Sequence, residues 1–157
     1  MTNRLAWTAG NGVGFTWSVA NANAGTLANG NSVLDSTDIL NQTALDIYAD
    51  VSISLTIASS TIAAGANMTF WIAMLNQDGT TYGDNKVTTT PAAVTPSYSP
   101  AAVIPTNPGT AQTSIIGNAF GIIIPPGTFR WLVQNNIGFT LTAATIKYRT
   151  YNMNLNN

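Results

Sequence analysis

The stretch Leu45-Asp-Ile-Tyr-Ala-Asp-Val-Ser-Ile-Ser-Leu-Thr-Ile57 decides the fold class of this chain. Every odd position in it is apolar, and the even positions carry Asp, Tyr, Ser or Thr. Successive side chains of a β-strand point to opposite faces, so this alternation predicts a long strand with one buried and one wet face. One-sided burial is typical of antiparallel sheets.

The rest of the chain continues with strands and turns. Residues 68–75 are apolar on both faces, with Thr69 the one polar residue, which predicts a strand that is central or covered by a partner. Asp78-Gly79 is a turn signal, and Pro125-Pro-Gly127 predicts a firm turn. Further strands are predicted at 113–116, 120–124, 128–134, 139–143 and 145–149. We expect no helix longer than one or two turns, and such a short helix would lie near residues 36–42.

The apolar phase changes from odd to even positions between Leu141 and Ile146. A bulge inserts one extra residue into a strand and shifts its phase in this way, so we expect a β-bulge near Ala143-Ala144.

The predicted fold is all-β, an antiparallel β-sandwich of jelly-roll type with an extended N-terminal arm. Residues 1–34 are rich in Gly, Asn and Ala and form the predicted arm, with one short alternating strand that includes Trp7, Phe15 and Trp17. Residues 35–157 form the predicted sandwich domain. Residues 91–108 hold five of the seven prolines, which predicts a surface excursion because proline lacks the ladder donor.

The charge composition restricts the partners. Charged residues make up 7% of the 157 residues, against roughly 25% in an average soluble domain. The net charge is −1 and the five cations are scattered, so we expect no nucleic-acid partner. The longest nearly apolar stretch, Phe70–Leu75, is far below the ~20 residues that span a bilayer, and residues 1–7 do not resemble a signal peptide. We therefore expect synthesis in the cytosol and no contact with a membrane.

The chain contains no His, no Cys and no Glu. Ser-His-Asp and Cys-His pairs and zinc sites of the usual N/S kind are therefore excluded by composition. Asp46 and Asp50, four residues apart on a strand, would stand about 13 Å apart at ~3.3 Å per residue, which is too wide for a catalytic pair, so we interpret them as solvated or capping side chains. Asp78 and Asp84 suit turns better than a Ca²⁺ loop. We expect no enzyme activity, no cofactor and no metal.

Four tryptophans leave a sugar-binding platform open as an alternative. Trp17, Trp71 and Trp131 lie in apolar stretches, where burial in a core or interface is the usual fate. Trp7 has the least apolar surroundings.

Two blocks of sequence carry a family resemblance. The first joins Ser36-Thr-Asp-Ile-Leu, the alternating stretch 45–57 and Gln77-Asp-Gly-Thr-Thr-Tyr82; the second joins residues 124–138 and Ile146-Lys-Tyr-Arg-Thr-Tyr-Asn152. Together they resemble a family of small β-sandwich structural proteins of tailed phages and prophages, over about residues 36–152. The resemblance implies a virion protein on the outer capsid surface, a decoration or cement subunit.

The implied partners are the major capsid protein and further copies of the chain, as a homodimer or homotrimer. We expect contacts to the capsid or a sister subunit in residues 1–34 and in the proline excursion. The candidate contact residues are Trp7, Phe15, Trp17, Tyr98, Val103 and Ile104. A tail, baseplate or head-fibre component that binds host glycans is the alternative function.

Overall fold

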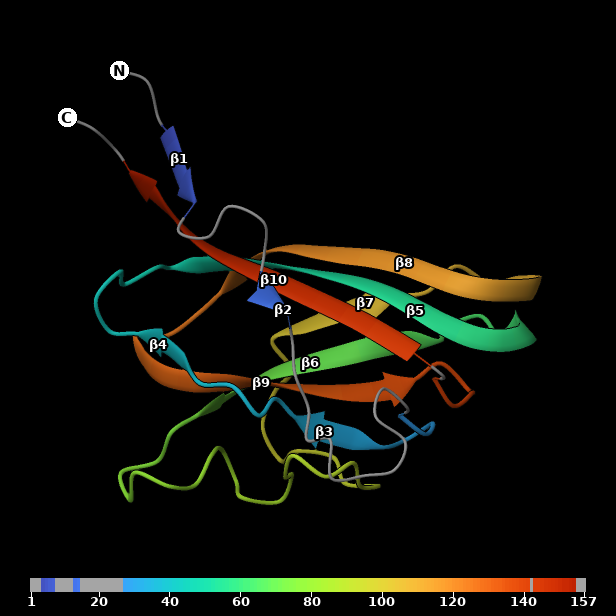
Figure 1. The fold of residues 1–157 in the computed structure, drawn as a ribbon, viewed down its shortest axis with the longest axis horizontal. Helices are drawn as coiled ribbons and strands as arrows, with labels where there is room; N and C mark the ends of the chain where they lie inside the picture. The colour runs from blue at the N-terminus through green and yellow to red at the C-terminus, as the bar shows by residue number, and fades with distance from the viewer. Residues whose placement is uncertain (1–3, 8–12, 15–26, 142, 155–157) are drawn as a thin grey trace.

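A computed structural model describes residues 4–7, 13–14, 27–141 and 143–154. These residues form ten strands and no helix, in two antiparallel sheets. The predicted all-β sandwich is thus confirmed, and Figure 1 shows its two layers. The strands are β1 (Arg4–Trp7), β2 (Val13–Gly14), β3 (Ser32–Leu34), β4 (Ile39–Asn41), β5 (Tyr48–Ile62), β6 (Asn67–Met74), β7 (Ala102–Pro105), β8 (Gly109–Ile123), β9 (Gly127–Asn136) and β10 (Ala143–Asn154).

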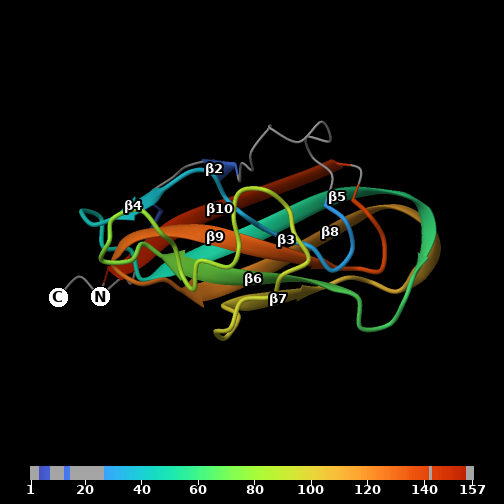
Figure 2. The same cartoon turned by 90° about the horizontal axis from the view of Figure 1, so that it is seen from below.

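The strands pair in a nested order. The first sheet runs β1-β10-β5-β8, and β2 also pairs with β10; the second runs β3-β9-β6-β7, and β4 also pairs with β9. Early strands therefore pair with late ones: β1 with β10, β4 with β9, β5 with β8, and β6 with β7. Figure 2 shows the sheets from the side of the loops that precede β7. This order leaves β8 and β7 as the edge strands on one side of the two sheets, and the short strands β1 to β4 form the opposite edges.

The core lies between the two sheets. Val51, Ile53, Leu55 and Ile57 of β5 are buried there, as the alternation predicts, and face Phe70 and Trp131 of the second sheet.

The strand starts later than predicted, at Tyr48, and continues to Ile62. Leu45 has a φ of 49° and, like Ile47, is about half exposed. Asn41 bonds the backbone N–H and C=O of Asp46, which fixes a loop where the pattern predicted strand.

β6 is buried on both faces, as its apolar sequence predicts. Its even positions face the core between the sheets. Trp71 and Ala73 face outward, under the chain that connects β6 to β7, with Leu34, Tyr82, Val87 and Leu132. The cover is part of the same chain, because residues 75–101 run across this sheet in Figures 1 and 2.

The predicted domain boundary at residue 34 does not coincide with a boundary of the fold. β3 (residues 32–34) pairs with β9, and Leu27 is fully buried, so the described part of residues 27–34 belongs to the sandwich. The short strands β1 and β2 both pair with β10. The proline excursion contains β7, which lies at a sheet edge as proline requires.

The C-terminal third differs from the prediction in two details. One strand, β8, replaces the two predicted at 113–116 and 120–124. The prediction of a bulge near Ala143-Ala144 is wrong, because β10 pairs with β5 without a break from Ala143 to Tyr151. Leu141 lies outside β10 in a bridge to Leu27, which accounts for the change of phase. The turn at Pro125-Pro126 lies between β8 and β9, as predicted.

Candidate binding surface

The two edge strands β7 and β8 lie side by side along one open side of the sandwich. Ile104 of β7 packs on Gly117 of β8, where a Cβ atom would come within 2.5 Å of the Ile104 Cγ2 atom. A glycine is therefore needed at this position for the two sheets to approach. The sandwich closes at this contact.

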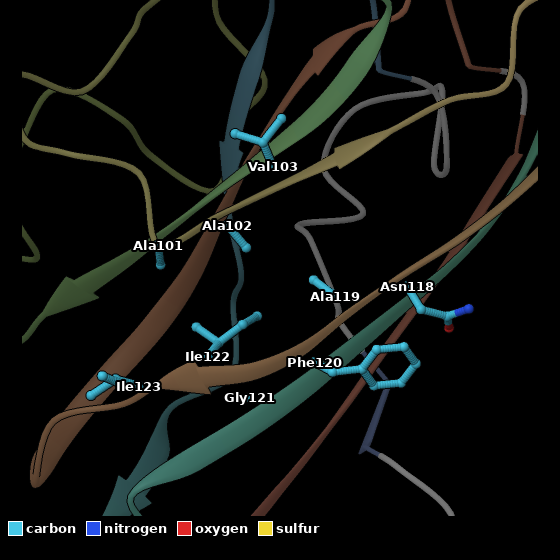
Figure 3. Close-up of a pocket in the computed structure, with 9 residues that line it drawn as sticks. All are labelled: Ala101, Ala102, Val103, Asn118, Ala119, Phe120, Gly121, Ile122 and Ile123. Atoms are coloured by element: carbon cyan, nitrogen blue, oxygen red, sulfur yellow. The ribbon is translucent and has the colours of Figure 1, made fainter.

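Beside this contact the two strands leave a groove. It has a volume of about 630 Å³ and is open to solvent. Its walls are small or apolar and none of them is charged: Ala101, Ala102, Val103, Asn118, Ala119, Phe120, Gly121, Ile122 and Ile123. Figure 3 shows Ala101, Ala102 and Val103 on one side of the groove and the β8 residues on the other. The groove can hold an uncharged, extended chain.

Large apolar side chains are exposed around this groove. Phe120 and Ile123 are 71% and 73% exposed, and Ile116 on the same strand is 74% exposed. Val103 of β7 is 51% exposed at the rim. Contiguous exposed apolar side chains mark interaction sites more often than isolated ones do.

A bulge in β8 sets the direction of these side chains. The register between β5 and β8 shifts between Ala49 and Val51, so Asp50 lies opposite both Phe120 and Gly121. Gly121 has a φ of 65°, which favours glycine, and its N–H donates to Asp50 Oδ1 at 3.0 Å. Arg149 Nη2 lies 3.4 Å from Asp50 Oδ2. Burial raises the pKa of Tyr151, and the neighbouring Asp50 raises it further.

A second group of exposed apolar side chains, here called the end cluster, consists of Leu40, Leu45 and Ile47. They are 67%, 53% and 51% exposed. The N–H of Ile124 donates to the carbonyl oxygen of Ile47 at 2.9 Å, so this segment is tied to the end of β8.

Most of the described carboxylates accept hydrogen bonds inside the fold. Asp38 accepts from the Tyr82 hydroxyl at 2.7 Å and from Arg130 Nε at 2.6 Å, and these contacts hold its pKa below the usual value. Asp78 accepts from the N–H groups of Thr80 and Thr81, and Asp84 from the N–H of Lys86, as the turn interpretation predicts; Asp84 also accepts from Ser97, 13 residues away. Asp46 and Asp50 are not solvated, since they are 4% and 8% exposed. Asp50 instead caps a backbone group, because it accepts from the N–H of Gly121, and Asp46 lies in the loop held by Asn41.

The structure separates the predicted contact residues. Val103 lies at the groove and is exposed. Ile104 was predicted as a surface contact, and this is wrong: it is 1% exposed, because its side chain packs in the core on Gly117. Tyr98 is partly buried against Gly83; its carbonyl accepts from Trp71 Nε1 at 3.0 Å, and burial raises its pKa to about 12.

Trp7 lies in β1, and nothing is described of its side chain. Phe15 and Trp17 lie outside the described residues, so their contacts stay predictions. Trp71 and Trp131 are buried, as predicted.

Sequence reasoning missed Ile116, Phe120 and Ile123. The sequence does contain a feature that could have pointed to them: residues 109–123 have no charge and no proline, and they lie between Pro108 and Pro125. Such an unprotected strand is unusual at a sheet edge, but only the strand order shows that this strand lies at an edge.

Comparison with protein-family models, with curated proteins and with solved structures gives no match to this chain. The family resemblance therefore stays a prediction. Within the described residues, no group of three or more acidic, His or Cys side chains is placed to hold a metal, and no helix could span a membrane.

Proposed function

We propose that this chain is a structural subunit of a tailed-phage particle, a capsid decoration or cement protein. In this role it binds the outer shell and bridges neighbouring major capsid proteins. The observation that carries the proposal is the surface: seven large apolar side chains of the described residues are at least half exposed, in a chain with few charges. A surface of this kind suits lasting contact with other subunits rather than free diffusion.

The nested strand order supports the jelly-roll interpretation. If β2 is counted with β1 and β4 with β3, eight strand positions form two four-position sheets in which early strands pair with late ones. Jelly rolls consist of eight strands in two sheets and include viral capsid and lectin domains. Because many functions share one fold, this order supports the proposal without carrying it.

The polar groups support a role without chemistry. Asp38, Asp78 and Asp84 each accept hydrogen bonds from neighbours in the fold. Such carboxylates are held as acceptors, whereas a general acid or base must be able to exchange a proton with a substrate. We place the shell contacts at the end cluster and at the predicted contact residues Trp7 and Val103.

The test is reconstitution on capsid shells that lack this protein, followed by electron-microscopy reconstruction. We expect density on the outer shell, at local two-fold or three-fold axes. Leu40→Ser and Ile47→Ser should lower its occupancy, whereas Thr88→Ser, an exposed polar control, should leave it unchanged. Deleting residues 1–30 is a less clean test, because it removes β1, β2 and the buried Leu27.

Density at the tail would overturn the proposal, and so would absence of the wild-type protein from the shell. Full occupancy by both end-cluster variants would overturn the placement of the shell contacts at the end cluster. Specific binding on a glycan array would favour the tail, baseplate or head-fibre alternative.

A further inference from the structure

We propose that β8 pairs antiparallel with β8 of a second copy of this chain, so that the first sheets of two copies become one continuous sheet. The inference goes beyond binding to a shell, since it concerns the chain with itself. It rests on the free edge of β8, on the residues of that edge, and on the groove beside it.

The free edge of β8 is long. β8 ends the strand order of its sheet, and no described strand pairs with its far side. It has 15 residues, about 50 Å at ~3.4 Å per residue. A strand edge of this length offers a row of backbone N–H and C=O groups to another chain.

This edge lacks the protection that the other edge strand has. β7 has four residues and ends in Pro105. β8 contains no Lys, no other charge and no proline from Gly109 to Ile123. Proteins block free edges with short strands, charges, prolines and bulges. β8 has a bulge at Phe120-Gly121, but residues 114–119 pair with β5 without a shift and carry none of these devices, so we expect this stretch of the edge to be paired.

The sequence of β8 suits a second copy of itself. A two-fold axis at Asn118 would bring the same strand together in antiparallel direction without opposing any like charges. Ile116 would then lie opposite Phe120 of the second copy, and Phe120 opposite its Ile116. Pairs of an aromatic and a β-branched residue stabilise neighbouring strands.

The exposed side chains and the groove fit this arrangement. Ile116 and Phe120 are 74% and 71% exposed in the single chain. The alanines at 101, 102 and 119 leave an uncharged groove beside residues 118–123 of β8. An approaching uncharged strand therefore meets no charged side chain along this part of the edge.

Sedimentation velocity of the full chain tests the pairing. We expect the wild-type chain to be a dimer. Phe120→Lys should weaken association by at least about tenfold, because the lysine of each copy would lie opposite the apolar Ile116 of the other copy. Leu40→Lys is the matched control, since Leu40 is similarly exposed, at 67%, but lies on β4. Circular dichroism checks that both variants fold.

A crosslinking test is independent of these variants. The chain has no cysteine, so Asn118→Cys introduces a single thiol. At the two-fold axis the two Cβ atoms would be about 4.5–5.5 Å apart, close enough for a disulfide after a small shift. We expect Asn118→Cys to form a dimer on oxidation much faster than Thr80→Cys on an exposed turn.

A monomeric or trimeric wild-type chain would overturn the inference, as would equal dissociation by Leu40→Lys or equal crosslinking of the two cysteine variants. These outcomes are separate from the shell test. A monomer that still decorates shells would leave the proposed function standing, and a β8-paired dimer that does not bind shells would remove only that function.

Discussion

At the scale of single residues, Asn135 joins three parts of the chain through one fully buried side chain. Its Nδ2 donates to the carbonyl oxygens of Leu27 and Phe139, both at 2.7 Å. Its Oδ1 accepts from the N–H of Ile137 at 3.1 Å. A buried amide with three bonds to the backbone fixes the turn after β9 and the segment before β3 together.

Asn135→Ala should lower the free energy of unfolding by about 2–4 kcal/mol, because three buried backbone groups lose their partner. Urea denaturation measures the change. Asn107→Ala, at an exposed asparagine away from the groove, serves as the control and should change the free energy of unfolding by less than about 0.5 kcal/mol. Equal effects of the two substitutions would contradict this role of Asn135.

Asp78 gives the stability of the chain a pH dependence. The Thr81 hydroxyl, then the N–H groups of Thr81 and Thr80, lower its pKa from 3.8 to about 2. A carboxyl whose pKa is lower in the folded state stabilises the fold above its unfolded pKa, and this contribution is lost as the pH falls through the folded value.

The wild-type chain should therefore be more stable than Asp78→Asn above about pH 4, and the difference should shrink towards pH 2. Urea midpoints of both proteins across this range measure it. The comparison isolates Asp78 from Asp38 and Asp84, whose pKa values are also lowered and which are present in both proteins. A difference that stays constant down to pH 2 would show that the charge of Asp78 is not involved.

At the scale of elements, the closure of the sandwich depends on one contact between its edge strands. Ile104 of β7 occupies the space above Gly117, and a Cβ there would also come within 3.3 Å of Ile53. The strand β7 has only one neighbour in its own sheet, β6, so this packing is what holds it against the first sheet.

Gly117→Ala should destabilise the fold by about 1–3 kcal/mol through overpacking. Ile104→Ala alone should cost about 2–5 kcal/mol, since the residue is buried. The double variant should be more stable than the sum of the two effects predicts, by about 0.5–3 kcal/mol, because the smaller side chain makes room for the new methyl group. Strict additivity in a double-mutant cycle would refute a direct contact.

At the scale of the whole molecule, the second sheet is buried on both faces. Its inner face packs on the first sheet, and its outer face packs under residues 75–101 of the same chain. Trp71 anchors this cover, since it is 3% exposed and its indole N–H donates to Tyr98. The connection between β6 and β7 thus acts as a third layer.

Trp71→Ala should destabilise the chain by about 3–5 kcal/mol, as much as Phe70→Ala, although the two neighbours face opposite sides of β6. Thermal and urea unfolding of both variants give the comparison. Trypsin should also cleave at Lys86 faster in the Trp71 variant, since Lys86 lies in the covering segment. A cost below about 1 kcal/mol for Trp71→Ala would show that the cover contributes little.

Much of the candidate surface could not be foreseen from the sequence. Val103 was predicted as a contact residue and lies at the groove, but its neighbour Ile104 packs inward. Alternation along β7 decides which of the two is exposed, and that phase depends on how β7 pairs with β6. Ile116 and Phe120 come from a strand whose sequence alone does not show whether it is central or at an edge.

The sequence by itself determined the fold class, since a period of two in β5 and turn residues such as Pro125-Pro126 are local properties of the chain. It also determined the absence of His, Cys and Glu, and with it the classes of chemistry that are excluded. Only the tertiary structure decided which strands lie at edges, that residues 75–101 cover the second sheet, and that Asp46 and Asp50 are buried. The physical reason is that edges, covers and buried charges depend on pairing between residues far apart in the chain, which local patterns do not encode.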